Sequence, residues 1–130
     1  MEALWGIDLG GTKIEGVVLD ASNPMSPLCR LRCPTEAHLG YQQILKNISG
    51  LIEKLSQETK LKPHHIGYAT PGISDPQTKL LKNSNTLCLN GKPLESDLKE
   101  ITNCRAKLAN DANCFALTVF TSLPCDASPR

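Results

Sequence analysis

The stretch WGIDLGGTK, residues 5–13, decides the fold. Together with the preceding leucine it predicts a buried strand that ends near the carboxylate of Asp8. A Gly-Gly-Thr turn follows at 10–12, and the next segment, 13–20, alternates in apolar character as a second strand does. The sequence therefore sets a carboxylate beside a turn that can hold a phosphate group and a metal ion, or that can be a plain hairpin.

The chain then changes from a period of two to a helical period. A turn containing Pro and Ser at 22–27 leads to a third strand candidate at 28–34, and the short links make the three strands an antiparallel meander. Apolar residues then recur at intervals of three and four, which predicts an amphipathic helix that stops before Pro63. The apolar face of this helix consists of Tyr41, Ile44, Leu45, Ile48, Leu51, Ile52 and Leu55.

Two further strands and two further helices complete the pattern. Short apolar segments at 66–70 and 104–109 predict strands, Pro93 is placed as the first residue of a helix, and Asn110 is a good N-cap for another. Three antiparallel strands followed by helix-linked strands define an α/β fold, a mixed sheet with helices on its faces. The helix after Pro93 is expected to place on one face Leu94, Leu98 and Ile101.

Composition excludes several classes of protein. The 130 residues suit one compact domain, and the 40% hydrophobic and 21% charged residues indicate an ordinary globular core. A net charge of +1 argues against nucleic acid as a partner, and no segment is apolar enough to cross a membrane. The six cysteines form no Cys-x-x-Cys pair, and no histidine stands at ligand spacing from them. We expect buried, reduced thiols in a cytoplasmic protein.

The Gly-Gly-Thr turn permits phosphate binding without requiring it. It is not a P-loop, and it is not a dinucleotide fingerprint, because a strand rather than a helix follows the glycines. Successive N–H groups at Gly10 and Gly11 can form an anion nest, and the Thr12 hydroxyl can donate one more hydrogen bond. Asp8 could orient Mg²⁺ through water. A plain hairpin whose glycines only supply positive φ fits the segment equally well.

A second candidate site is the segment NDANCFAL, residues 110–117. Asn110 and Asp111 stand where a strand ends and a helix is expected to begin, a preferred place for binding residues in α/β sheets. The positive end of a helix favours an ionised carboxylate at Asp111, which could accept the proton of a substrate hydroxyl. The Asn110 amide suits sugar hydroxyls. A plain helix cap with a dipole-matched aspartate is the alternative.

The loop before Pro93 is rich in amides. Asn83, Asn85 and Asn90 make a neutral polar surface that suits a ligand carrying many hydroxyl groups. Taken alone, the loop is more typical of a solvated stretch of turn formers.

Four motifs stand in chain order: GIDLGGTK at 6–13, GYATPG at 67–72, KNSNTLCLNGKPL at 82–94 and NDANCFAL at 110–117. In this order they resemble the ROK family of bacterial sugar kinases, which belongs to the superfamily of actin and hexokinase. The resemblance covers roughly 4–117, and NDANCFAL is its most specific part. It implies a ribonuclease-H-like core, with the amino-terminal lobe of a kinase at 1–117 and a tail or the start of a second lobe at 118–130.

The resemblance assigns the Gly-Gly-Thr turn to a nucleotide. It implies that ATP and Mg²⁺ are the cofactors, that the turn faces the phosphates, and that Asp8 helps to place the metal ion. The residues that match the family's phosphate-binding turn are Asp8, Gly10, Gly11 and Thr12, with Lys13 following it.

The resemblance also assigns the sugar site. Asp111 matches the catalytic base that takes the proton from the attacking sugar hydroxyl, while Asn110, Gly72 and Asn85 match sugar-contacting positions. The hexose is left open among fructose, glucose and an N-acetylhexosamine. The fructokinase-like subgroup usually carries Trp before LNG, where this chain has Cys88.

The family's second lobe supplies another Gly-rich turn, further sugar-binding residues and a His/Cys zinc site, which this chain lacks after Leu117. We expect the 130 residues alone to have little or no kinase activity and to bind sugar weakly. We also expect the apolar surface left uncovered to support homo-oligomers. A non-catalytic sugar-binding or interaction module is the alternative. A sugar-responsive ROK regulator is a further one, but it needs a DNA-binding segment before the first strand, which begins by Leu4.

Overall fold

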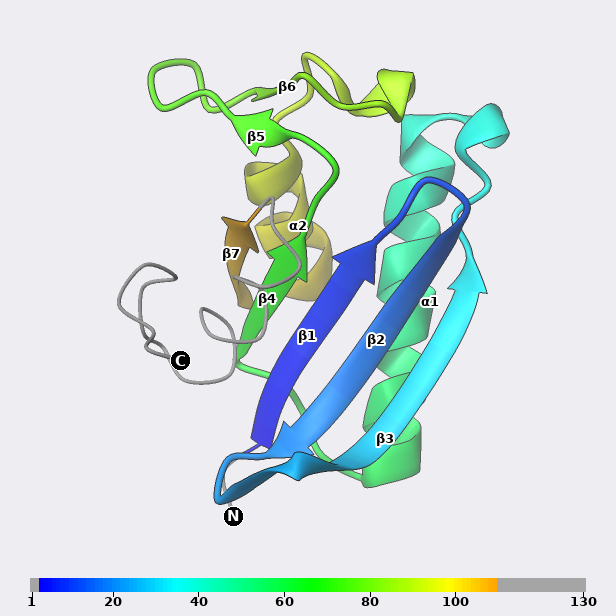
Figure 1. The fold of residues 1–130 in the computed structure, drawn as a ribbon, viewed down its shortest axis with the longest axis vertical. Helices are drawn as coiled ribbons and strands as arrows, with labels where there is room; N and C mark the ends of the chain where they lie inside the picture. The colour runs from blue at the N-terminus through cyan, green and yellow to red at the C-terminus, as the bar shows by residue number, and fades with distance from the viewer. Residues whose placement is uncertain (1–2, 110–130) are drawn as a thin grey trace.

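The computed structural model describes residues 3–109. Its main sheet has five strands in the order β3-β2-β1-β4-β7, and Figure 1 shows the long helix lying along one face of it. The first three strands pair antiparallel, which confirms the predicted meander. They are β1 (Ala3–Leu9), β2 (Lys13–Asp20) and β3 (Asn23–Pro34).

The other half of the sheet is parallel. β4 (His65–Ala69) runs parallel to β1, and β7 (Arg105–Ala109) runs parallel to β4, so the mixed α/β sheet is confirmed. Parallel strands need crossovers, and the two helices of the described chain lie in the segments that connect β3 to β4 and β4 to β7.

The predicted turn at 22–27 is wrong in part, because β3 already begins at Asn23. The register of β3 against β2 shifts here: Asp20 pairs with Asn23, whereas Leu19 pairs with Pro27. Three residues of β3, 24–26, therefore have no partner on β2, and a second shift leaves Leu28 without one as well. A bulge is one of the few places in a ladder that tolerate proline, which has no N–H to donate.

Helix α1 (Tyr41–Thr59) covers β1, β2 and β3 with the face that its spacing predicts. All seven apolar residues of that face are buried. The helix approaches the sheet closely at Gly16, where a Cβ would lie 2.7 Å from Leu55 Cδ1 and 3.2 Å from Leu51 Cδ2. Gly16 is therefore required by packing.

Helix α2 (Leu94–Thr102) packs beside β7 and α1, with Leu94 and Leu98 fully buried. One prediction for this helix is wrong, because Pro93 is the N-cap rather than the first helical residue. Leu94, Leu98 and Ile101 all lie in the helix at the spacing of one face, and Ile101 is 39% exposed where it lines a groove between α1 and α2. The start of α1 is tied to α2 by the Tyr41 hydroxyl, which donates to Asp97 Oδ2 at 2.6 Å.

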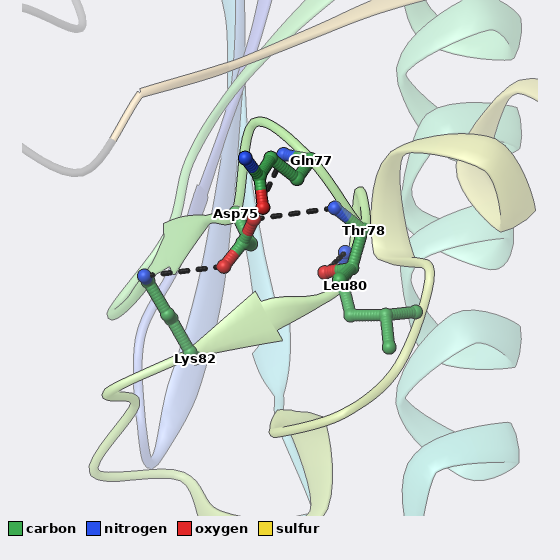
Figure 2. Close-up of polar contacts among 5 residues, drawn as sticks. All are labelled: Asp75, Gln77, Thr78, Leu80 and Lys82. Carbon is green, nitrogen blue, oxygen red and sulfur yellow. Dashed lines mark hydrogen bonds and ion pairs between the residues drawn. The ribbon is translucent and has the colours of Figure 1, made fainter.

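Short elements in the loops had no signal in the sequence. A hairpin of β5 (Ile73–Ser74) and β6 (Leu81–Lys82) forms a second small sheet, and η1 (Ala37–Leu39) and η2 (Leu87–Leu89) are single turns of 3-10 helix. Figure 2 shows how Asp75 closes the hairpin. Its Oδ1 accepts from the N–H groups of Gln77 (2.8 Å) and Thr78 (3.2 Å), and its Oδ2 pairs with Lys82 Nζ at 3.3 Å.

The cysteine prediction is confirmed only in part. The four cysteines within residues 3–109 are free thiols, but each is half-buried rather than buried. In the same range no three His, Cys, Asp or Glu side chains are grouped to hold a metal ion. No helix among these residues is long and apolar enough to span a membrane.

The contact at Gly16 leads to the first prediction. Gly16→Ala should lower the free energy of unfolding by about 1–3 kcal/mol, because the new methyl group overlaps the α1 side chains. Gly50→Ala is the matched control, since Gly50 lies in α1 with nothing within 4 Å of its Cβ position, and it should gain about 0.5–1 kcal/mol. Urea unfolding measures both, and a neutral Gly16→Ala would contradict the described packing.

Candidate functional site

The carboxyl ends of three parallel strands meet at one edge of the sheet. The register pairs Asp8 with Ala69 and Ala69 with Ala109, and on the other side it pairs Asp8 with Glu15. One row of residues thus crosses four strands at this edge, where Figure 1 also shows the β1–β2 turn. In open α/β sheets, ligands bind outside the carboxyl ends of the strands.

The β1–β2 turn is shaped by close backbone contacts. The Gly10 N–H donates to Lys13 O at 3.0 Å, and a Cβ on Gly10 would lie 2.7 Å from that oxygen. The glycines of residues 3–109 with positive φ are Gly40 and Gly91, so neither Gly10 nor Gly11 supplies a positive φ. The plain-hairpin alternative based on positive φ is therefore wrong.

The turn leaves backbone donors available. Within the described residues, the N–H groups of Gly11 and Thr12 donate no hydrogen bond, and both residues are exposed. Successive N–H groups of this kind form a concave site for an anion. Lys13 is exposed beside them and adds a positive charge. The geometry of the turn is thus compatible with a phosphate group.

Asp8 reaches solvent at the end of β1, directly across from Glu15. Burial of the carboxyl and then the negative charge of Glu15 raise the pKa of Asp8 above its ordinary value. Glu15 itself pairs with Arg30 (3.4 Å) and Arg32 (3.2 Å). A cation bound at Asp8 would restore its charged form. One carboxylate with open space for waters suits Mg²⁺, which takes few protein ligands.

The amide-rich loop contacts the turn and is held rigid by one of its own amides. Asn90 Oδ1 accepts from the Ser84 N–H at 2.9 Å and Asn90 Nδ2 donates to Ser84 O at 3.1 Å. A Cβ on Gly11 would lie 3.6 Å from Thr86 Oγ1, so the loop and the turn are neighbours. Asn90 therefore supports the loop. Asn85 is exposed, and none of the described residues hydrogen-bonds its side chain.

Gly72 has a packing reason to be glycine. It is buried, and a Cβ there would lie 2.6 Å from Lys82 O and 3.1 Å from the Ser84 backbone nitrogen. The Thr70 hydroxyl donates to Gly72 O at 2.9 Å. A contact between Gly72 and a sugar stays a prediction. Asn110 and Asp111 follow β7 directly in the sequence but lie outside the described residues, so their roles stay predictions as well.

Thr35 is a residue of the site that sequence reasoning missed. Its side chain is fully buried, its hydroxyl donates to Gly10 O at 2.8 Å, and its N–H donates to Thr12 O at 3.0 Å. Its neighbour from α1 is Asn47, whose Nδ2 donates to Thr35 O at 3.1 Å. No local pattern signals these contacts, because the partners are far apart in the sequence.

The chain belongs to the ROK family, whose pattern matches residues 4–122. Among its relatives, the N-acetyl-D-glucosamine kinase of Vibrio atlanticus is 36% identical over 114 residues, which are 88% of this chain and 36% of the relative. The corresponding kinase of Salmonella typhimurium is 34% identical over the same share of each chain. The chain thus spans about a third of the length of these relatives.

Solved structures share the fold. The ROK hexokinase of Thermus thermophilus superposes with a TM-score of 0.74 at 29% identity, over 90% of this chain and 38% of that one. A ROK glucokinase from Streptomyces griseus, in complex with glucose and AMPPNP, gives 0.73 at 20% identity, over 92% of this chain and 37% of that one. The expected ribonuclease-H-like fold of this superfamily is therefore confirmed.

The surroundings of Asp8 raise its pKa and those of Asp75 lower its pKa, which leads to a prediction on stability and pH. Asp8→Asn should raise the free energy of unfolding at pH 7, because a raised folded-state pKa means that the ionised carboxylate destabilises the fold. Asp75→Asn should lower it at pH 7, because hydrogen bonds from Gln77 and Thr78 and the pairing with Lys82 lower the pKa of Asp75.

Urea unfolding across the acid range checks both signs. The Asp8→Asn difference should vanish as the pH falls below the ordinary carboxyl value of 3.8, where both states are protonated. The Asp75→Asn difference should begin to shrink only below that value, as the pH falls through the lowered folded-state pKa. A loss of stability in Asp8→Asn at pH 7 would be inconsistent with the described environment.

The packing of Gly72 gives a separate prediction. Gly72→Ala should lower the free energy of unfolding by about 1–3 kcal/mol, since the methyl group would overlap the β6 backbone. Gly11→Ala meets only an ordinary contact, and its effect should stay within about 1 kcal/mol. Thermal and urea unfolding of the two variants test this order, and the reverse order would show that the loop contact is wrong.

Proposed function

We propose that this chain is the amino-terminal lobe of an ATP-dependent kinase that phosphorylates a hexose. One observation carries the proposal: the turn with unused N–H groups lies at the sheet edge beside Asp8 and against the loop that carries Asn85. A phosphate site and a surface for hydroxyl groups are thereby neighbours. Family membership supports the same conclusion, because the relatives quoted above are named kinases.

In this proposal the β1–β2 turn binds the nucleotide, and the loop that carries Asn85 binds the sugar. The N–H groups of Gly11 and Thr12, with Lys13, bind and orient the phosphates of ATP, and Asp8 holds Mg²⁺ through water. The metal ion, when bound, neutralises charge on the transferring phosphoryl group. Positioning and charge neutralisation are most of what a protein contributes to phosphoryl transfer.

The sugar side of the proposal rests on residues from two loops. Asp111 takes the proton of the attacking hydroxyl, and Asn110 and Asn85 hydrogen-bond the other hydroxyl groups, with Gly72 shaping the loop beside them. The substrate proposed first is N-acetyl-D-glucosamine, since relatives at 32–36% identity are named kinases of that sugar. Glucose is second, because glucose is bound in the Streptomyces griseus glucokinase.

The proposal includes a limit on activity. Residues 3–109 provide one wall of a cleft, and the relatives are almost three times as long as the part that matches. Exclusion of water and clamping of ATP need a second wall. We therefore propose that the 130 residues alone bind substrates weakly and turn over slowly. The cytoplasmic location and the formation of homo-oligomers stay predictions.

A chimera tests the catalytic assignment. Residues 1–117 would replace the matching lobe of the Vibrio atlanticus N-acetyl-D-glucosamine kinase, and ADP release with a panel of hexoses would be measured. The chimera should phosphorylate N-acetyl-D-glucosamine. Asp111→Asn in the chimera should lower kcat by about 10²–10⁴-fold and leave sugar binding largely intact, because it removes the general base.

Asp20→Asn is the matched control in the same chimera. Asp20 lies at the opposite end of β2, where it accepts hydrogen bonds from Ser22, and its substitution should leave kcat unchanged. A folded chimera with no turnover and no binding of MgATP or hexose would overturn the proposal and favour a non-catalytic interaction module. Rapid turnover by the 130 residues alone would overturn the limit on activity.

A further inference from the structure

Thr35 controls two peptide groups of the β1–β2 turn. It is fully buried between β3 and η1, and it donates two hydrogen bonds. One runs from its hydroxyl to Gly10 O at 2.8 Å, and the other runs from its N–H to Thr12 O at 3.0 Å. A single residue thus engages the carbonyl groups on both sides of the Gly11–Thr12 peptide group.

These two bonds fix where the neighbouring N–H groups point. A trans peptide group is planar, and its C=O and N–H bonds point in opposite directions. Because the Gly10 carbonyl points at the Thr35 hydroxyl, the Gly11 N–H must point away from Thr35. The Thr12 carbonyl points at the Thr35 N–H, so the Lys13 N–H must also point away. Both donors therefore face away from the buried residue that holds the turn.

Thr35 is itself held by helix α1. Asn47 Nδ2 donates to Thr35 O at 3.1 Å and to Glu36 Oε1 at 2.9 Å, and Gln43 Nε2 donates to Asn47 Oδ1 at 2.8 Å. The turn is thereby connected to the most regular helix of the fold through buried or half-buried groups. Such a connection reduces the freedom that a bound anion would otherwise have to remove.

We propose that Thr35 is a positioning residue of the phosphate site: its hydroxyl and N–H hold the peptide groups that flank the Gly11–Thr12 pair, so that the Gly11 N–H faces the phosphates of the nucleotide. The inference rests on the proposed function and deepens it. Thr35 touches no substrate in this role. It acts through the turn, and so its loss should weaken nucleotide binding and leave hexose binding unchanged.

Two substitutions at one position separate the hydroxyl from the shape of the side chain. Thr35→Val keeps the volume and removes the bond to Gly10 O, whereas Thr35→Ser keeps the hydroxyl. In the 130-residue chain, MgATP binding would be followed through the NMR shifts of the Gly11 and Thr12 amides. Thr35→Val should raise the Kd for MgATP by about five- to tenfold, and Thr35→Ser should stay near the wild-type value.

Thr59→Val is the matched control. It also removes a threonine hydroxyl, but that hydroxyl donates within α1 to Leu55 O at 2.8 Å, at the end of the helix remote from the turn. Its Kd for MgATP should equal that of the wild type. Binding of N-acetyl-D-glucosamine, measured in parallel, should be the same in all three variants. A merely structural role of Thr35 would move the two ligands together.

Each outcome decides the proposal. If the wild type binds MgATP and Thr35→Val binds it equally well, the role of Thr35 is overturned and the proposed function stands. If the wild type shows no shift at Gly11 and Thr12 with MgATP, both are overturned. If Thr35→Val fails to fold, Asn47→Asp replaces it, because it removes the donor to Thr35 O from a half-buried position of α1; wild-type affinity in that variant overturns the proposal.

Discussion

The in-register parallel pairing of β1, β4 and β7 is the constraint on which the site depends. Asp8 shares a row with Ala69 and Ala109, so the strand that carries the carboxylate and the strand that leads to Asn110 and Asp111 end at the same edge, with β4 between them. A shift of one residue would turn the side chains of β1 to the opposite face. Burial prevents this shift, because alternate residues of β1 are packed into the core: Trp5, Ile7 and Leu9.

Two features of the candidate site are unfavourable for the stability of the fold. Asp8 lies across from Glu15 at a partly buried strand end, where burial and like charge make the ionised form unfavourable without a cation. The N–H groups of Gly11 and Thr12 lack partners among the described residues. The loop residues nearby show the opposite behaviour, since Asn90 and Asp75 use their polar groups to close turns. Within residues 3–109, unused donors and a carboxylate without an ion-pair partner at the same edge distinguish the candidate site from its surroundings.

The regular spacing of apolar residues along the sequence predicted much of the fold. The seven buried residues of α1 repeat at helical spacing over about four turns, so the pattern is visible without any structure. The β5–β6 hairpin is not, because strands of two residues have no period. The contacts of Thr35 span 25 residues to Gly10, and no local rule pairs such positions. The sequence located the β1–β2 turn but left open whether its glycines are there to supply a positive φ. The backbone contradicts that explanation. Gly10 is needed instead because Lys13 O approaches it closely.

The assignment of this sheet edge as the nucleotide site is tested most directly by paramagnetic NMR. The chain would be studied with ATP and with Mn²⁺ in place of Mg²⁺. A metal ion held at Asp8 beside the turn should broaden first the amide signals of the sheet edge, at 8–13 and 69–70, because these lie in or next to the row through Asp8. The connection between β2 and β3 at 21–22, at the other end of the sheet, should keep sharp signals. Broadening centred elsewhere, with residues 8–13 unaffected, would contradict the assignment of this edge as the nucleotide site.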